Sequence, residues 1–216
     1  GWELTQNPGN VKINGSVANP TISGLTPGTY TYSVAKYEPI GLKAEYFNNN
    51  SLTGTPALTR TDATINFDWS NDIKPDPTIN LDNYSVRWSG KIKPKYTENY
   101  TFSTISDDRI RLWVNGVQMI NNWTNHAATT DTSAVISLVA GQLYDIRLEY
   151  FENTGYSVSK LYWVSSSQSN QIIPQSQLFS ISCSSPVSGN VVIAANQINE
   201  WNGDVSSDWN NPDNWC

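Results

Sequence analysis

Residues 101–116 read TFSTISDDRIRLWVNG, and this stretch decides how the middle of the chain folds. Polar and apolar side chains alternate across 101–105 and again across 109–115, and a period of two predicts β-strands. Between the two predicted strands lie two adjacent acids, Asp107 and Asp108. A turn needs at most one Asp, and like charges side by side repel each other. The pair is therefore either a solvated turn or a site that holds a cation.

The same alternation recurs along much of the chain. It is found at 42–46, 84–89 and 144–150, in segments separated by Gly, Pro and Asn. The Asn-Gly pair at 115–116 suits a type I′ turn, so a hairpin is expected at 114–117. Aromatic residues make up 12% of the sequence, which favours strands over helices. We predict an all-β fold with little helix: an antiparallel two-sheet β-sandwich, jelly-roll or barrel-like in form, with short β-rich flanking segments.

Charge and hydropathy argue against two classes of partner. The net charge is −6 and the pI is about 4.7, whereas binding to phosphates requires clustered Lys and Arg, so no nucleic acid is expected. No apolar run approaches the roughly 20 residues of a membrane span, so no membrane insertion is expected. Asn, Ser and Thr supply much of the polar surface, as is common in secreted bacterial β proteins. The sequence begins at Gly1 without Met or a signal peptide, and we interpret it as a piece of a larger multidomain extracellular or cell-surface chain.

Three zones differ in pattern and are predicted to be separate parts. Residues 1–39 form a β-rich flanking segment. Within it Tyr30 follows a Pro-Gly turn and resembles the tyrosine corner of immunoglobulin-like and fibronectin type III sandwiches. Residues 40–180 contain the main series of strands. Residues 181–216 are rich in Trp and are predicted to be a segment of an adjoining module.

The residues do not support a catalytic or zinc site. The chain has one His, His126, in a polar loop, and no Gly-x-Ser-x-Gly motif surrounds a Ser. We expect His126 to bond to loop backbone, and we expect that the chain is not an enzyme. The two Cys, Cys183 and Cys216, lie far from His126 in sequence, whereas zinc ligands occur at short spacing. A disulfide between the Cys residues and two separate thiols both stay open, because spacing does not show that their Cβ atoms meet.

The chemistry of the acidic pair points to one particular cation. Carboxylates are hard oxygen ligands, and Ca²⁺ takes six to eight oxygens at about 2.3–2.6 Å. Both side chains can face one ion if their peptide unit departs from the strand pattern, for which a cis peptide is one way. A second loop must add oxygens, and FENTGY at 151–156, with Asn153 and Gly155, is the best candidate by composition. From the residues alone, a calcium site and a solvated turn both stand.

Five stretches resemble the β-sandwich domain family named after the N-terminal part of bacterial protective antigen, the PA-fourteen family. They are GLKAEYFNN, YSVRWSGKIKP, ENYTFSTISDDRIRLWVNG, INNWTNH and YDIRLEYFENTGYSVSKLYW, in the family's order. The resemblance covers residues 41–180 and implies a two-sheet antiparallel sandwich. It is to the calcium-dependent lectin and adhesin branch, in which an Asp-Asp pair with a cis peptide holds Ca²⁺. Adjacent sugar hydroxyls then bind the same ion.

The resemblance also implies a set of site residues. The implied metal ligands are Asp107, Asp108, Asn153, Thr154 and Gly155, and the implied carbohydrate-binding residues are Asp107, Asp108, Arg109, Asn153, Tyr156 and Trp123. Many members have Gly after the acidic pair, whereas Arg109 here either narrows the site or bonds a sugar. The implied function is a Ca²⁺-dependent carbohydrate-binding module of a bacterial extracellular or surface protein. The alternatives are a spacer or interaction domain in which Ca²⁺ only adds rigidity, and an accessory domain of a glycoside hydrolase.

Overall fold

The structure is a computed structural model, which describes residues 2–9, 11–15, 24–70, 73–181 and 187–193. Their regular structure consists of strands and one turn of 3-10 helix, Gln175–Gln177. None of these residues belongs to a helix with the length and apolar character needed to cross a membrane. The chain divides into two compact units, one formed by Pro39–Ser180 and the other by Gly1–Glu38 together with Ile181–Cys216.

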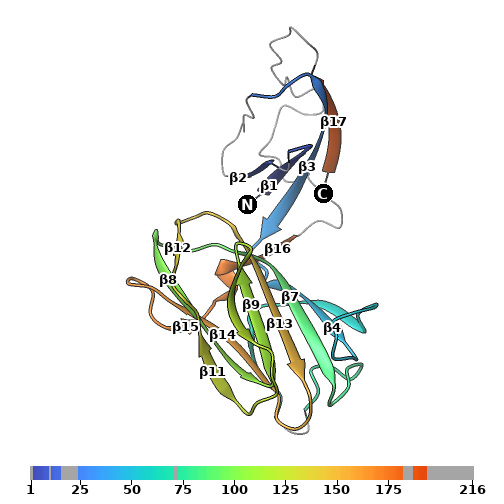
Figure 1. Ribbon diagram of the computed structural model, residues 1–216, viewed down its shortest axis with the longest axis vertical. Helices are drawn as coiled ribbons and strands as arrows, with labels where there is room; N and C mark the ends of the chain where they lie inside the picture. The colour runs from blue at the N-terminus through green and yellow to red at the C-terminus, as the bar shows by residue number, and fades with distance from the viewer. Residues whose placement is uncertain (1, 10, 16–23, 71–72, 182–186, 194–216) are drawn as a thin grey trace. The chain divides into compact units, whose positions relative to one another are not determined.

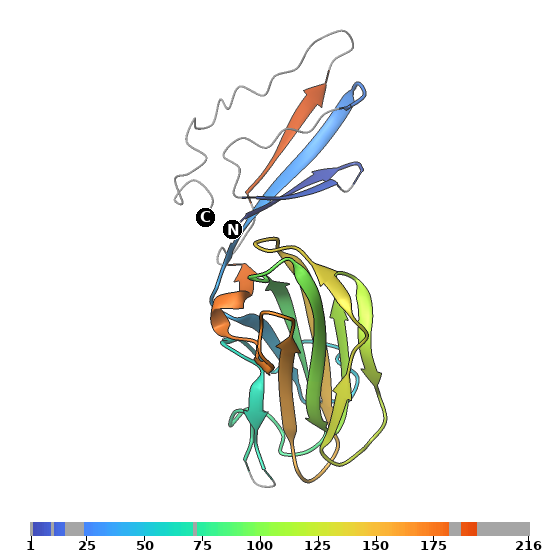
Figure 2. The ribbon, with the colours of Figure 1, turned by 90° about the vertical axis from the view of Figure 1, so that its left-hand side faces the viewer.

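The unit Pro39–Ser180 is a sandwich of two antiparallel sheets, which confirms the predicted fold class (Figures 1 and 2). The strands of its larger sheet are β10 (Val117–Asn122), β9 (Arg109–Val114), β13 (Tyr144–Glu152), β7 (Tyr84–Ile92), β4 (Leu42–Phe47), β5 (Leu58–Asp62) and β16 (Leu178–Ile181). In this sheet β7 pairs with β13 on one edge, and β4 and β16 share the other. The strands of the smaller sheet are β11 (Thr129–Thr132), β8 (Glu98–Asp107), β14 (Val158–Val164), β15 (Gln171–Ile172), β12 (Ile136–Leu138) and β6 (Asn66–Asp68).

The acidic pair lies where the chain passes from one sheet to the other. Strand β8 belongs to the smaller sheet and β9 to the larger one, so the connection is a crossover at the end of the sandwich and not the tight turn that the spacing suggests. The hairpin predicted at 114–117 is confirmed, because β9 and β10 pair around Asn115 and Gly116. These two residues have φ values of +51° and +77°, as a type I′ turn requires.

The core lies between the two sheets and is built from alternate residues of each strand. In β13 the inward set is Tyr144, Ile146, Leu148, Tyr150 and Glu152, of which four are apolar or aromatic and the last is an acid. Trp88 and Trp163 are fully buried on opposite sheets. Each large apolar side chain buried in this way stabilises the fold by roughly 1.5–3 kcal/mol. An inward-facing acid at the end of such a series is therefore a costly exception.

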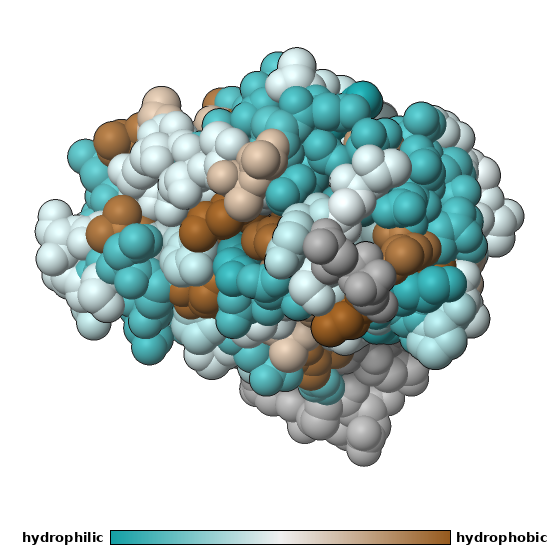
Figure 3. All heavy atoms as spheres, turned by 90° about the horizontal axis from the view of Figure 1, so that it is seen from below, coloured by the Kyte–Doolittle hydropathy of each residue, from teal (hydrophilic) through white to brown (hydrophobic). Residues whose placement is uncertain are grey.

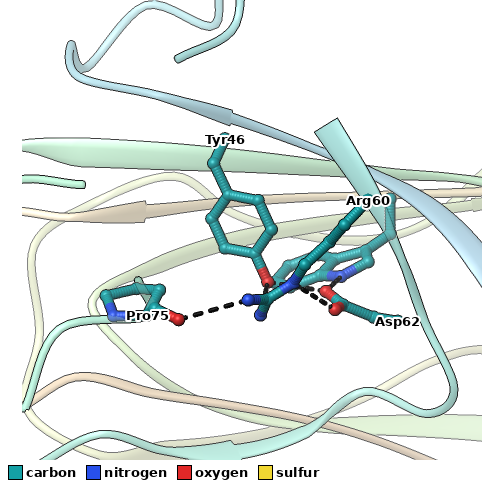
Figure 4. A network of polar contacts seen from close by, with 5 residues as sticks. Tyr46, Arg60, Asp62 and Pro75 are labelled. Carbon is teal, nitrogen blue, oxygen red and sulfur yellow. Dashed lines mark hydrogen bonds and ion pairs between the residues drawn. The ribbon is translucent and has the colours of Figure 1, made fainter. Parts of the chain in front are cut away.

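Asp62 is a second buried carboxylate, in the larger sheet, and both of its oxygens accept hydrogen bonds (Figure 4). Asp62 is 6% exposed and its Oδ2 accepts hydrogen bonds from the Tyr46 hydroxyl at 2.6 Å and the Trp88 indole at 2.8 Å. Its Oδ1 accepts from Arg60 Nε at 2.7 Å, and Arg60 also donates to the carbonyl of Pro75. This network joins β4, β5 and β7 to the loop before β7, so we assign it a structural role.

The second unit contains a four-stranded antiparallel sheet. Its strands, in spatial order, are β2 (Val11–Gly15), β1 (Trp2–Asn7), β3 (Gly28–Glu38) and β17 (Val187–Ile193), and Figure 1 shows β17 beside β3. Segments from both ends of the chain thus build one sheet. The tyrosine corner is confirmed, because the Tyr30 hydroxyl donates to the carbonyl of Thr26 at 2.9 Å. Cys183, Cys216 and the Trp-rich part of the C-terminal segment lie outside the described residues.

Candidate metal centre

Asp108 is held rigidly by the backbone of two loops. The side chain is 6% exposed. Its Oδ1 accepts a hydrogen bond from the backbone N–H of His126 at 3.0 Å, and its Oδ2 accepts one from the N–H of Asn153 at 2.8 Å. Each N–H leaves further lone pairs on the oxygen that it contacts. Asp108 therefore links the two loops and still has oxygen lone pairs to offer a cation.

Asp107 precedes it through a cis peptide bond. Its carbonyl oxygen accepts a hydrogen bond from the hydroxyl of Tyr150 on β13. Burial raises the pKa of its half-buried side chain, and the neighbouring charge of Asp108 raises it further. A positive charge between the two carboxylates would remove both penalties.

Glu152 is the third carboxylate of the group, and it is the last inward-facing residue of β13. It is 0% exposed. Its Oε2 lies 2.8 Å from the Tyr150 hydroxyl, while its Oε1 is buried without a hydrogen-bond partner among the described residues. Ligand oxygens of Asp107, Asp108 and Glu152 all lie within 4.8 Å of one another. Burial raises the pKa of Glu152 to about 8 and outweighs the hydrogen bond from the Tyr150 hydroxyl, which lowers it; repulsion from Asp108 and Asp107 raises it further.

The cluster contains more acceptors than protons. The Tyr150 hydroxyl has a single proton but faces two acceptors, the Asp107 carbonyl and Glu152 Oε2, while the Ser157 hydroxyl at 3.0 Å has a proton of its own. One proton cannot serve both acceptors. The arrangement is complete only if Glu152 carries an extra proton or if a cation lies among the carboxylates. Carboxylate and carbonyl oxygens are the donor set that Ca²⁺ prefers, so these residues fit a calcium ion.

The predicted second loop does meet the acidic pair, at 151–156. Asn153 reaches Asp108 through its backbone N–H, and its carbonyl accepts from the N–H of Asn83 at 3.0 Å. Gly155 has φ +102° and donates its N–H to Asp82 at 3.3 Å. Thr154 is exposed, and Tyr156 is 55% exposed. The structure thus places the predicted loop beside the pair, and the roles of its side chain and carbonyls as metal ligands stay predictions.

Arg109 turns toward the outer face of the larger sheet. Its Nε donates to Asn125 Oδ1 at 2.6 Å, and its guanidinium lies 4.7 Å from the ring centroid of Phe151. Both contacts hold the Arg109 side chain on this outer face. The predicted sugar contact Trp123 carries the guanidinium of Arg111 at 3.8 Å from its ring centroid. One aromatic face of Trp123 is therefore occupied by an Arg.

Sequence reasoning missed Glu152 as a member of the cluster. The signal was present, because the alternation that puts Tyr144 to Tyr150 inward continues by one step to Glu152. The prediction for His126 is confirmed: its Nδ1 lies 3.0 Å from the carbonyl of Ala127.

Figure 3 views the end of the sandwich at which β13 ends and β9 begins. That end is largely hydrophilic, with separate hydrophobic patches, as suits a site for polar ligands.

Comparison with known proteins assigns the sandwich to a domain family. Residues 40–177 match the PA14 domain. The chain belongs to the PA14 domain family. The family assignment agrees with the two-sheet sandwich, which is the fold expected from the sequence motifs.

Three similar proteins place this PA14 domain among known ones. An anti-sigma-I factor, RsgI3 of Acetivibrio thermocellus, is 46% identical over 139 residues, which are 64% of this chain and 21% of the relative. A solved anti-sigma factor domain-containing protein from Clostridium clariflavum is 45% identical with a TM-score of 0.60, over 64% of this chain and 46% of that one. A PA14 sugar-binding domain from an RTX adhesin shares the fold, with 16% identity and a TM-score of 0.54, over 64% of this chain and 97% of that one. The chain thus spans about a fifth of the length of the curated relative.

Proposed function

We propose that the PA14 domain of this chain is a Ca²⁺-dependent carbohydrate-binding module and not an enzyme. The single observation that carries the proposal is the convergence of Asp107, Asp108 and Glu152, in which a buried Glu152 oxygen has no hydrogen-bond partner in the described part of the chain. An unpartnered buried carboxylate oxygen is costly unless a proton or cation meets it. A cation at this position accounts for the cost.

The residues of the site would divide the work as follows. Asp107, Asp108 and Glu152 would hold the ion, and the backbone of the 151–156 loop would keep Asp108 in place through its N–H group. A bound Ca²⁺ would accept two adjacent sugar hydroxyls in place of two waters. Tyr156, which is 55% exposed beside this loop, would contact the sugar ring. The ligand would be a glycan or polysaccharide outside the cell or at its surface, and several linked copies would raise the avidity of such a shallow site.

Glycan binding with and without calcium tests the proposal. The protein is applied to a glycan array in Ca²⁺ and again in chelator, beside the variants Asp108→Asn and Asp76→Asn. Asp76 is a partly exposed acid outside the cluster whose carboxylate closes a turn onto Thr78, a role that Asn also fills, so it is a matched control. We expect binding that is lost in chelator and in Asp108→Asn and kept in Asp76→Asn. Absence of glycan binding in both media would sink the lectin assignment. A melting temperature raised by Ca²⁺ in that case would favour the spacer role, with the ion used for rigidity.

The similarity to anti-sigma factors favours a second candidate, a sugar-sensing module of a regulatory protein. The observation behind it is the 46% identity with RsgI3, which is far higher than the 16% identity with the adhesin domain. The two candidates share the sugar site and differ in the parent chain. Co-purification of the natural full-length parent with sigma factors separates them: a stable sigma-factor complex supports the regulator, and its absence supports the adhesin.

A further inference from the structure

The outer face of the larger sheet has a pattern that the calcium site does not use. Outward residues of three adjacent strands form cross-strand rows. One row is Arg87, Glu149 and Arg111, and the next row is Ser89, Arg147 and Trp113. Side chains directly opposite each other on adjacent strands are in contact range. These two rows therefore form one continuous surface across β7, β13 and β9.

This surface has more positive than negative charge. Glu149 is 4% exposed, and its Oε1 accepts from Arg87 at 3.0 Å while its Oε2 accepts from Arg111 at 2.6 Å. Arg147 is a third guanidinium beside the same carboxylate, at 3.8 Å. One acid thus faces three Arg residues, and the adjacent Lys91 is balanced by Asp145 at 2.9 Å. A local surplus of positive charge on a chain of net charge −6 calls for an anionic partner.

Two Arg residues of the surface are held in place by Trp rings. The guanidinium of Arg147 lies 4.1 Å from the centroid of Trp113, and that of Arg111 lies 3.8 Å from the centroid of Trp123. Such stacking fixes the plane of the guanidinium without using its N–H donors. The Nε of Arg111 has no hydrogen-bond partner in the part of the chain that the structure describes. Both groups are therefore oriented, but the Arg111 Nε is buried, so Arg147 is the guanidinium that a ligand can reach.

A groove gives a ligand access to Arg147. The groove has a volume of about 510 Å³ and is lined by Ser89, Gly90, Trp113, Gly116, Asp145, Ile146 and Arg147. The one acid in this lining, Asp145, is paired with Lys91. The Arg147 side chain is 47% exposed. A Cβ at Gly116 would meet no atom within 4 Å, so the backbone there is open and a flat ring can approach it closely. The groove thus combines an aromatic edge, a hydroxyl and an accessible guanidinium.

We propose that this groove is a second binding site, for the carboxylate or sulfate group of an acidic sugar chain. Arg147 would bind the anion through two parallel hydrogen bonds, the bidentate geometry for which a planar guanidinium is suited. Trp113 would act as a positioning residue for Arg147. The anion site stands on charge and geometry alone, whereas the choice of a sugar as its carrier rests on the proposed function. Trp113 lies five residues beyond Asp108 along β9, about 17 Å in an extended strand, so one chain could reach both sites.

Binding to a uronic-acid homopolymer in chelator tests this site apart from the calcium site. The polymer and its methyl ester are titrated onto the protein and onto Arg147→Ala, Asp108→Asn and Lys160→Ala. Lys160 lies on β14 in the other sheet, and Lys160→Ala removes one positive charge as Arg147→Ala does, so this variant is the matched control. We expect the acid polymer to bind without calcium, to weaken at high salt, and to lose at least tenfold affinity in Arg147→Ala. The methyl ester should bind at least tenfold more weakly, and the other two variants should stay within twofold of the parent.

Several outcomes would overturn the proposal. Unchanged affinity in Arg147→Ala, equal affinity for the methyl ester, or a requirement for calcium would each remove the second site. Equal binding of a single-stranded nucleic acid would show that the surface does not select sugars. Arg147→Ala must keep the parent melting temperature, and Arg147→Lys, which keeps the charge but not the planar fork, should bind with intermediate affinity. Because Asp108→Asn leaves this groove intact, failure of the calcium site and failure of this site give different results.

Discussion

Replacing Glu152 by Gln should have opposite effects on the metal-free and the calcium-bound protein. Gln has nearly the same shape but no charge at any pH. In the metal-free protein Glu152 is buried and its pKa is raised to about 8. The unfolded chain releases this proton near the ordinary glutamate pKa of 4.5, whereas the folded protein keeps it. Between pH 4.5 and about 8, the free energy of unfolding therefore falls as the pH rises.

The magnitude follows from the same two values. Each pH unit in that window changes the free energy of unfolding by about 1.4 kcal/mol. From pH 4.5 to pH 7 this amounts to roughly 3–3.5 kcal/mol. Glu152→Gln has no proton to lose, so at pH 7 it should stabilise the metal-free protein by up to this amount. For a domain of about 150 residues, 3 kcal/mol corresponds to a rise in melting temperature of roughly 6–12 °C.

Calcium should reverse the ranking. Below pH 8 the ion must displace the Glu152 proton, so the calcium affinity of the parent should rise roughly 20-fold from pH 6.5 to pH 8.5. At a calcium concentration 1,000 times the dissociation constant, binding stabilises the folded parent by about 4.1 kcal/mol, which is more than Glu152→Gln gains without metal. Glu152→Gln removes one of three carboxylates, so it should bind calcium more weakly and lose most of this pH dependence.

Thermal unfolding and calorimetric calcium titration at three pH values measure both effects. The matched control is Glu98→Gln, because hydrogen bonds from Ser165 and Ser167 lower the pKa of Glu98 instead of raising it. Glu98 therefore stabilises the fold above its unfolded pKa, and its loss should lower the melting temperature at pH 7 without changing calcium affinity. If Glu152→Gln instead lowers the metal-free melting temperature and binds calcium as the parent does, the assignment of Glu152 to a proton-deficient metal site is wrong.

Four further substitutions test the fold away from the candidate metal site. Asp62→Ala leaves the buried Trp88 indole and its companions without their acceptor, and it should cost about 3–5 kcal/mol in chemical denaturation. Gly41→Ala should lower the free energy of unfolding by about 2 kcal/mol or more, because φ is +111° and the new Cβ would lie 2.2 Å from a carbonyl oxygen. Gly54→Ala, with φ +79° and open space around its Cβ, should cost clearly less in the same assay. Tyr30→Phe should cost about 1 kcal/mol in the unit of β1, β2, β3 and β17 and leave the calcium-induced shift of the sandwich unchanged.

The fold was predictable because the alternation of apolar and polar residues is local. Tyr144, Ile146 and Leu148 alternate with polar residues whether or not the rest of the chain is known, and such alternation fixes one buried face. The partners of each strand depend on distant segments. For that reason 101–116 looked like two strands joined by a turn, although β8 and β9 belong to different sheets. The pairing of β17 with β3 is likewise a contact between the two ends of the chain, and no local pattern encodes it.

The candidate site was predictable in part for the same reason. Asp107 and Asp108 are adjacent in sequence, and the 151–156 loop was found by its composition. Glu152 is not among the predicted ligands: an acid at the end of a strand usually faces solvent, whereas here the register turns it into the core. Arg111 lies on β9 and stacks on Trp123, which follows β10, and no pattern in the sequence predicts this contact.

Anomalous diffraction from crystals soaked in calcium tests the central claim most directly. The proposed function predicts one strong peak bound by carboxylate oxygens of Asp107, Asp108 and Glu152. The same soak of Asp108→Asn crystals should show a weaker peak or none. Crystals of the parent protein with no peak among these three carboxylates at saturating calcium, or with the ion bound elsewhere, would contradict it.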